Sequence, residues 1–369
     1  MDGGAGAFQL CFPSHNASCL RARRPPSQAA LLYTLVGTAG LLTSLLNLLV
    51  IISIAHFRQL HTPTNTLLLS LAVCDLLVGA LVMPVEGLRY VESCWLLGRA
   101  LCTLSPFYTY CLLSASVGNL VLVSLDRYLA VCQPLHYHST VTMGRVRAGV
   151  CGCWLCSVLY NGLVLEEHLA RPLRYSRCYG DCVVVVSQAW GTIDLLFTCV
   201  GPCLVMVLLY LRVFAAAASQ VRLVNAMSMA GAVRRSEWKA AWTLGVVVAV
   251  FLLCFCPYYY PLVVGQDTSN SLAYFSAVSW IMLANSCVNP LIYALFYPWF
   301  RTALRCIFTL KILEPGVVCL AMFPTAFKPD DVERTRHKLK EREKEERGEE
   351  KKREIDRERE RARERETTS

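Results

Sequence analysis

Long apolar segments separated by short polar connections dominate the chain up to about residue 310. A transmembrane helix satisfies its backbone polar groups internally and needs about 20 predominantly apolar residues to cross a bilayer. Seven segments meet this requirement, and two of them contain a single acidic residue each, Asp75 and Asp194. The predicted spans are residues 31–55, 66–84, 101–125, 148–165, 183–211, 240–265 and 268–299. The pattern predicts an all-α membrane protein with seven transmembrane helices in one bundle.

The charged residues divide the chain into two physically different parts. Of the 63 Asp, Glu, Lys and Arg residues, 31 lie within residues 328–369, a composition that cannot bury a core. We expect this low-complexity tail to be disordered or a single helix stabilised by i, i+4 charge pairs. A partner-binding tail and a gene model read past its natural end are the alternatives. The expected organisation is an N-terminal segment (1–29), the seven-span domain (30–310), a juxtamembrane apolar stretch too short to span (311–327) and the tail.

Basic residues gather on one side of the predicted bundle. With the N-terminus outside, the inner side has twelve Lys and Arg against three acidic residues, whereas the outer side has eight against seven. Cytoplasmic connections carry the excess of Lys and Arg in membrane proteins, so we expect an extracellular N-terminus and a cytoplasmic C-terminus. The sequon Asn16-Ala17-Ser18 agrees, because Asn16 can be glycosylated only on the outer side. The net charge of +9 therefore reflects membrane orientation, and no nucleic-acid partner is expected.

Six of the 19 cysteines lie on the predicted outer side of the membrane. An even set of cysteines in an oxidising compartment predicts disulfides, although six cysteines allow 15 connectivities. The six are Cys11, Cys19, Cys94, Cys102, Cys178 and Cys182.

Short motifs occur at one per predicted span and in a fixed order. They are Asn47, Leu71-Ala72-Val73-Cys74-Asp75, Asp126-Arg127-Tyr128, Trp154, Pro202 with Tyr210, Cys256-Pro257 and Asn289-Pro290-Leu291-Ile292-Tyr293. With them the chain resembles the rhodopsin-like (class A) G protein-coupled receptors. Residues 285–300 narrow the resemblance to the trace amine-associated receptors. The resemblance implies a plasma-membrane receptor with no enzymatic activity, a short amphipathic helix after the seventh span, a small amine ligand and a heterotrimeric G protein as partner.

Asp194 in the fifth span has no basic partner in the predicted bundle, because none of the seven spans contains Lys or Arg. A charged side chain in hydrocarbon is a functional candidate whose partner should be named, and an ammonium arriving from solution fits this requirement. Thr198 lies one turn further along the same helical face and can add a hydrogen bond. Tyr258, Tyr259 and Trp280 lie at comparable depth, where ring faces stabilise an ammonium.

The resemblance supports the same site, with the ammonium at the fifth span and not, as is usual, at the third. Amine receptors of this class usually hold the ammonium with an Asp in the third span, but Thr109 occupies that position here. Some amine-detecting members, especially in fish, instead have an Asp eight residues before the fifth-span proline, and eight residues before Pro202 is Asp194. We expect the ammonium at Asp194 and the ligand's tail toward the third and seventh spans. The remaining expected ligand contacts are Tyr110, Leu113, Leu283 and Phe255, which replaces the usual tryptophan.

The number of ammonium groups on the ligand stays open at this point. A diamine needs a second acid, and five acids on the outer side are available or simply solvated, the reading that we favour. These acids are Glu86, Glu166, Glu167, Asp181 and Asp267.

Asp75 belongs to a second polar group in the middle of the bundle. By analogy with related receptors it shares one layer with five other polar residues. The layer suits either a hydrated sodium ion, which would be allosteric, or a water-filled network without an ion. Its other members are Asn47, Ser116, Asn285, Ser286 and Asn289.

The resemblance also implies a switch at the inner face and two disulfides at the outer face. Arg127, which ends the third span, is held at rest by Asp126 and Glu237, and the motif continues with Tyr128. Tyr210 and Tyr293 stabilise the open form. The implied disulfides join Cys102 to Cys182, and Cys178 to either Cys11 or Cys19.

The resemblance to the amine-detecting receptors also implies the function of the chain. We expect an olfactory receptor that activates a stimulatory or olfactory-type G protein and raises cAMP. The alternative is another aminergic or orphan class A receptor without an odorant role.

Overall fold

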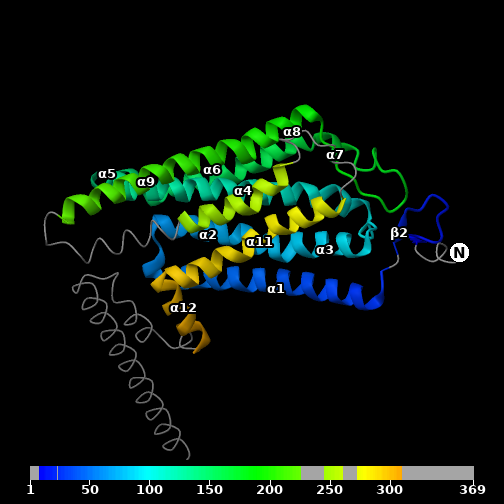
Figure 1. Ribbon diagram of the computed structural model, residues 1–369, viewed down its shortest axis with the longest axis horizontal. Coiled ribbons are helices and arrows are strands. Elements are labelled where there is room, and N and C mark those ends of the chain that lie inside the picture. The colour runs from blue at the N-terminus through cyan, green and yellow to red at the C-terminus, as the bar shows by residue number, and fades with distance from the viewer. Residues whose placement is uncertain (1–7, 23, 226–244, 261–271, 310–369) are drawn as a thin grey trace, which may run out of the picture. The chain divides into compact units, whose positions relative to one another are not determined.

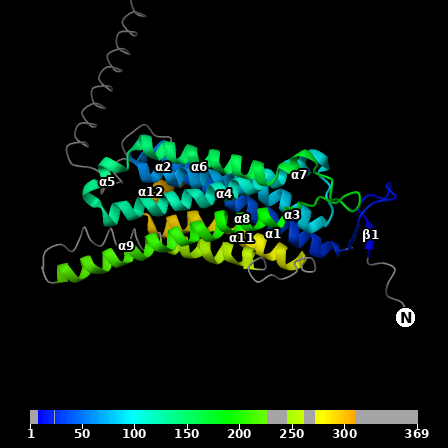
Figure 2. The same ribbon diagram turned by 90° about the horizontal axis from the view of Figure 1, so that it is seen from above.

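The computed structural model describes residues 8–22, 24–225, 245–260 and 272–309. Within them, long helices run side by side in a bundle (Figures 1 and 2). α4 packs against α2, α6 and α9, and α1 packs against α2, α3 and α11. The bundle helices are α1 (Pro26–His56), α2 (Pro63–Leu77), α3 (Met83–Glu92), α4 (Gly98–Cys132), α6 (Met143–Val164), α8 (Gln188–Asp194), α9 (Gly201–Asn225), Gly245–Tyr260 and α11 (Leu272–Phe296).

Short elements connect or extend the bundle helices. They are β1 (Phe8–Leu10), β2 (Leu20–Ala22), η1 (Arg58–Leu60), η2 (Val78–Val82), α5 (Pro134–Thr140), α7 (Glu166–Ala170), η3 (Leu195–Val200) and α12 (Pro298–Phe308). The β-hairpin and α7 lie at one end of the bundle and α5 lies at the other (Figure 1). We call these the hairpin end and the α5 end.

Each of the seven predicted spans contains a described helix. Five of these helical stretches are long and apolar enough to cross a membrane by length and composition alone. Large hydrophobic side chains are exposed on their outward faces, for example Leu41 at 62% and Leu208 at 60%, as expected for helices in lipid. The long apolar helices and their exposed hydrophobic faces agree with an all-α membrane bundle.

The predicted start of the fifth span is wrong. Residues 183–187 are not helical, and α8 begins at Gln188, where the side chain of Ser187 accepts a hydrogen bond from the Trp190 backbone at 3.3 Å. Ser187 is thus an N-cap that ends the preceding loop, whereas the prediction followed only the apolar run. Residues 240–244, 261–265 and 268–271 of the sixth and seventh predicted spans lie outside the described residues.

Two π-helical turns, η2 and η3, interrupt the spans that contain the intramembrane acids. η2 begins three residues after Asp75, and η3 begins directly after Asp194. A π turn adds a residue to the helical repeat and is frequent at functional sites. Each turn therefore changes which residues beyond the acid face the bundle.

Gly79 in η2 lets α1 approach closely. A Cβ at Gly79 would lie 2.8 Å from the Ser44 hydroxyl, 2.9 Å from the Ser44 backbone nitrogen and 2.9 Å from Thr43 Cβ. Since a backbone atom is among these neighbours, rotation of a side chain cannot relieve the overlap.

We therefore expect Gly79→Ala to destabilise the bundle by about 1–3 kcal/mol. The measurement is the thermal unfolding midpoint in detergent, together with the fraction of protein at the cell surface. Gly37→Ala in α1 is the matched control, because nothing lies within 4 Å of its added Cβ and alanine is the better helix former. Equal midpoints for the two variants would contradict the close packing.

Three disulfides join the hairpin end to the bundle. The structure pairs Cys102 with Cys182, as the resemblance implies, and selects Cys19 as the partner of Cys178. The third disulfide, Cys11 to Cys94, was not foreseen. The N-terminal segment is therefore linked covalently both to the end of α3 and to the loop that follows α7.

Candidate functional site

Asp194 lies at the end of α8 with its carboxylate inside the bundle. The Tyr160 hydroxyl of α6 donates to Oδ1 at 3.1 Å, and the Tyr259 hydroxyl of Gly245–Tyr260 donates to Oδ2 at 3.1 Å. Thr198 donates to Oδ1 at 3.2 Å and lies 2.8 Å from the Tyr259 hydroxyl. The residues that the structure describes give Asp194 no ion pair. Three hydroxyls therefore position a half-buried carboxylate whose charge no described side chain neutralises.

A row of phenols continues from Asp194 toward α4. The rings of Tyr259 and Tyr258 meet edge to face with centroids 5.1 Å apart. The Tyr258 hydroxyl lies 3.5 Å from the Tyr110 hydroxyl of α4. Of the expected ligand contacts, these phenols and Thr198 are the ones that the structure connects with Asp194.

The other expected ligand contacts lie in apolar surroundings. Leu113, Phe255 and Leu283 are buried in the hydrophobic core, and Trp280 packs against that core. Thr109 Oγ1 is buried and has no hydrogen-bond partner among the described residues. None of these five forms a described polar contact with Asp194.

Tyr160 is a site residue that sequence reasoning missed. It donates to Asp194 and its ring stacks on Phe197, with centroids 5.3 Å apart and planes 21° apart. A tyrosine inside a span needs a partner for its hydroxyl, so its position in the fourth span was an available signal.

Asp75 is fully buried in the middle of the bundle. Asn289 Nδ2 donates to its Oδ2 at 2.8 Å, and Asn47 Nδ2 donates to the Ser286 carbonyl at 2.9 Å. Other buried oxygens have no hydrogen-bond partner among the described residues. They are Asp75 Oδ1, Asn47 Oδ1, Ser116 Oγ, Asn119 Oδ1, Asn285 Oδ1 and Asn289 Oδ1.

These unpartnered oxygens fit a small hard cation with its water. Buried polar atoms are normally hydrogen-bonded, and sodium takes oxygen ligands. The oxygen atoms of the expected residues are therefore chemically suited to the ion.

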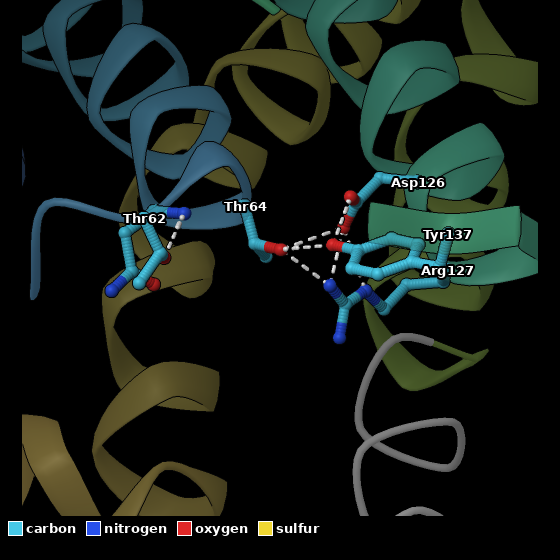
Figure 3. A network of polar contacts seen from close by, with 6 residues as sticks. Thr62, Thr64, Asp126, Arg127 and Tyr137 are labelled. Carbon is cyan, nitrogen blue, oxygen red and sulfur yellow. Dashed lines mark hydrogen bonds and ion pairs between the residues drawn. The ribbon is translucent and has the colours of Figure 1, made fainter. Parts of the chain in front are cut away.

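Asp126 and Arg127 form a closed network at the α5 end (Figure 3). Asp126 Oδ2 accepts from Arg127 Nε at 2.9 Å and from the Thr64 hydroxyl at 2.9 Å. Asp126 Oδ1 accepts from the Tyr137 hydroxyl at 2.8 Å, and Arg127 Nη2 donates to both Asp126 and Thr64. The Asp126 side chain is only 2% exposed. Asp126 and Thr64 thus hold the guanidinium directly, and Tyr137 holds Asp126, so that three helices take part.

Tyr137 keeps its proton in this network. Burial is the main cause that raises its pKa, and the neighbouring Asp126 carboxylate adds to the effect. Since the phenol stays protonated at neutral pH, it remains a hydrogen-bond donor to Asp126.

Thr64 and Tyr137 were missed because they lie on other elements than Asp126, 62 and 11 residues away in the sequence. The cap of α2 gives the available signal for Thr64: Thr62 accepts from the Asn65 backbone at 3.2 Å and Pro63 starts the helix. This fixes the first turn of α2 beside α4 (Figure 3).

Of the four other expected switch residues, the structure describes three. Glu237 lies outside the described residues. Tyr128 is half-buried in α4. The Tyr210 and Tyr293 hydroxyls are buried without a hydrogen-bond partner among the described residues.

The half-buried Asp194 site, the polar layer around Asp75 and the Asp126–Arg127 network thus belong to one bundle of helices. The family model of the 7 transmembrane receptor (rhodopsin family) matches residues 46–293. Trace amine-associated receptor 13c of Danio rerio is 39% identical over 332 residues, which cover 85% of this chain and 96% of that protein.

Two mammalian proteins show a similar likeness. Trace amine-associated receptor 7c of Rattus norvegicus is 38% identical over 338 residues, covering 87% of this chain and 94% of that protein. Trace amine-associated receptor 6 of Homo sapiens is 36% identical over 336 residues, covering 86% and 96%. The chain belongs to the trace amine-associated receptor family of rhodopsin-like G protein-coupled receptors.

Family membership establishes the class of function. The protein is a multi-pass receptor of the plasma membrane and not an enzyme. Its partners are a small-molecule ligand and a heterotrimeric G protein.

Proposed function

We propose that the protein is an olfactory amine receptor that binds an ammonium at Asp194 and activates a stimulatory or olfactory-type G protein to raise cAMP. The observation that carries the proposal is the Asp194 carboxylate, which three hydroxyls hold without a cationic partner among the described residues. A partly desolvated carboxylate favours a cation, and the tyrosine rings beside it stabilise an ammonium. The names of the relatives support an amine as the ligand.

A cAMP reporter assay tests the proposal. Alkyl, aryl and polyamines are compared with alcohols of the same carbon skeleton in cells that display the receptor. Amines are expected to raise cAMP and the alcohols to be inactive. Equal responses to both series would contradict recognition of the charge. Absence from olfactory epithelium would instead favour the second candidate, an aminergic receptor without an odorant role.

The hairpin end is proposed to be extracellular and the α5 end cytoplasmic. Basic residues concentrate at the ends of the spans near α5, and the three disulfides of the hairpin end require an oxidising compartment. Asn16 is exposed in the hairpin, so we propose it as a glycosylation site.

The layer around Asp75 is proposed to hold an allosteric sodium ion. The ion would supply positive charge next to the buried carboxylate, and Asp75, Asn47, Ser116, Asn285 and Asn289 would provide oxygen atoms. Its ligand-dependent release would couple the layer to the Asp194 site.

Asp75→Asn is therefore expected to abolish the effect of sodium on amine potency. In the parent receptor, replacing sodium by a bulky organic cation should raise amine potency about fivefold or more, a typical allosteric coupling. The measurement is the dose-response in membranes at constant ionic strength. The same sodium dependence in both proteins would argue against an ion at this layer.

A further inference from the structure

Two stacked rings, Tyr160 of α6 and Phe197 of η3, connect the Asp194 carboxylate with the lipid-facing surface of the bundle. The Tyr160 hydroxyl donates to Asp194 Oδ1 at 3.1 Å, and its ring stacks on Phe197 with centroids 5.3 Å apart. Phe197 is 68% exposed, so most of its ring is turned away from the bundle. A single stacking contact therefore lies between a residue that holds the carboxylate and the surface that contacts lipid.

The π turn η3 gives Phe197 this outward direction. In a regular α-helix the residues three and four positions after Asp194 share its face, and these are Phe197 and Thr198. Because η3 begins directly after Asp194 and widens the helical repeat, the third position turns away and the fourth stays aligned. Thr198 accordingly donates to the Asp194 carbonyl at 2.6 Å and to Oδ1 at 3.2 Å, whereas Phe197 is exposed.

Exposed apolar side chains surround the two rings. Leu159 precedes Tyr160 in α6, Leu196 precedes Phe197 in η3, and Leu204 lies further along α9; all three leucines are exposed. In a transmembrane bundle such outward apolar faces are covered by acyl chains. Hydrocarbon therefore borders the two rings on the outer side.

The depth of Asp194 suits an amine that is anchored in the bilayer. Asp194 is the sixth residue after Gln188, where α8 begins, which corresponds to about 9 Å along the helix. With the hairpin end extracellular, this level lies in the outer part of the span. An amphiphilic cation keeps its charge near the headgroups while its chain lies among the acyl chains. Its ammonium can therefore reach the carboxylate with the chain still in lipid.

We propose that Asp194 is reached from the outer leaflet of the bilayer, between α6 and η3, by amphiphilic primary amines whose alkyl chain stays in lipid. The proposal rests on the amine receptor proposed above and names a ligand class and an entry route for its site. Rotation of the Phe197 ring away from Tyr160 opens the route without unfolding a helix. The ammonium then binds the carboxylate, and the chain leaves the bundle beside Phe197 and lies along Leu204.

Three long-chain n-alkylamines of equal length test where the chain ends. One ends in a methyl group, one in a bulky apolar adamantyl group and one in a sulfonate. They are assayed by cAMP response on the parent receptor, beside a short-chain amine. The adamantyl amine is expected to be at least as potent as the methyl-terminated amine, because lipid accepts both ends. The sulfonate is expected to lower potency about a hundredfold, because it places a charge in hydrocarbon.

Phe197→Ala provides a second test through a gain of response. A long-chain amine with a tert-butyl branch close to the nitrogen is too wide to pass the Phe197 ring in the parent. The variant frees the space of the ring, so the potency of the branched amine relative to the unbranched amine is expected to rise at least tenfold. Leu41→Ala is the matched control, since it removes a similarly exposed side chain from α1 and should leave this ratio unchanged.

The outcomes separate the entry route from the proposed function. A sulfonate as potent as the methyl-terminated amine would show that the chain ends in water, and loss of both capped amines would show a closed pocket; either result overturns the proposal. An inactive methyl-terminated amine, or an unchanged ratio in Phe197→Ala at a normal surface level, overturns it too. In each case a response to the short-chain amine shows that the amine receptor itself holds. Failure of every amine on the parent would instead overturn the proposed function.

Discussion

Asp194→Asn is expected to reduce amine potency by two or more orders of magnitude. Asparagine keeps the size of the side chain and one oxygen for the hydroxyls of Tyr160, Thr198 and Tyr259, so the variant removes chiefly the charge. Breaking a buried ion pair by removing one partner costs about 3–5 kcal/mol, which corresponds to at least a hundredfold change in affinity. The measurement is the cAMP dose-response to the best amine, normalised to receptor at the cell surface.

Tyr160→Phe is the matched control for Asp194→Asn. It removes one of the three hydroxyls that donate to the carboxylate but leaves the charge, so the expected loss is about 0.5–1.5 kcal/mol. An Asp194→Asn receptor with an unchanged dose-response at a normal surface level would contradict an ammonium at this residue. Equal losses in the two variants would show that Asp194 acts through its hydrogen bonds and not through its charge.

The sequence predicted the bundle because span length and apolarity are enforced by the bilayer itself. The same logic exposed Asp75 and Asp194, since an acid in a span stands out against an apolar background. The contacts of Asp194 with Thr198 and Tyr259 followed from helical spacing and the position of Pro257. The spans, the two acids and these contacts all depend on local sequence. The structure shows the spans and places Thr198 and Tyr259 in contact with Asp194.

Other features depend on neighbours that hydropathy does not record. The π turns η2 and η3 change the register by about one residue, which is invisible to an average over a whole span. Tyr160 was missed because an aromatic residue in a span is equally compatible with core packing. The Cys11–Cys94 disulfide required knowing that the hairpin returns to the end of α3.

The Asp126 network also depends on neighbours that hydropathy does not record, and this dependence has a functional consequence. The motif Asp126-Arg127-Tyr128 and its resemblance to the class implied Glu237 as the second partner of Arg127. The structure adds Thr64 as a partner of both residues and Tyr137 as a partner of Asp126. These two residues come from α2 and α5, so the position of the guanidinium depends on how three helices pack together. Movement of any of these helices would therefore change the network that holds Arg127.

Asp126→Asn is expected to raise basal cAMP about tenfold in the absence of amine. The substitution keeps the shape of the side chain but removes the charge that accepts from Arg127 Nε at 2.9 Å. A hydrogen bond to a charged group contributes about 1.5–3 kcal/mol. Since about 1.4 kcal/mol shifts a two-state equilibrium tenfold, loss of this contact from the resting state increases the population in which Arg127 is released.

Tyr137→Phe distinguishes the effect of the Asp126 charge from the effect of its hydrogen bond with Tyr137. It removes only the neutral donor to Oδ1, so a rise in basal cAMP of severalfold at most is expected from about 0.5–1.5 kcal/mol. Basal cAMP per receptor at the surface is the measurement for both variants. An Asp126→Asn receptor as silent as the parent, present at the surface and still responsive to amine, would show that the resting state does not depend on this carboxylate. The order Asp126→Asn above Tyr137→Phe above parent would indicate that the hydrogen bond from α5 helps to hold the resting state by positioning a charge that itself retains Arg127.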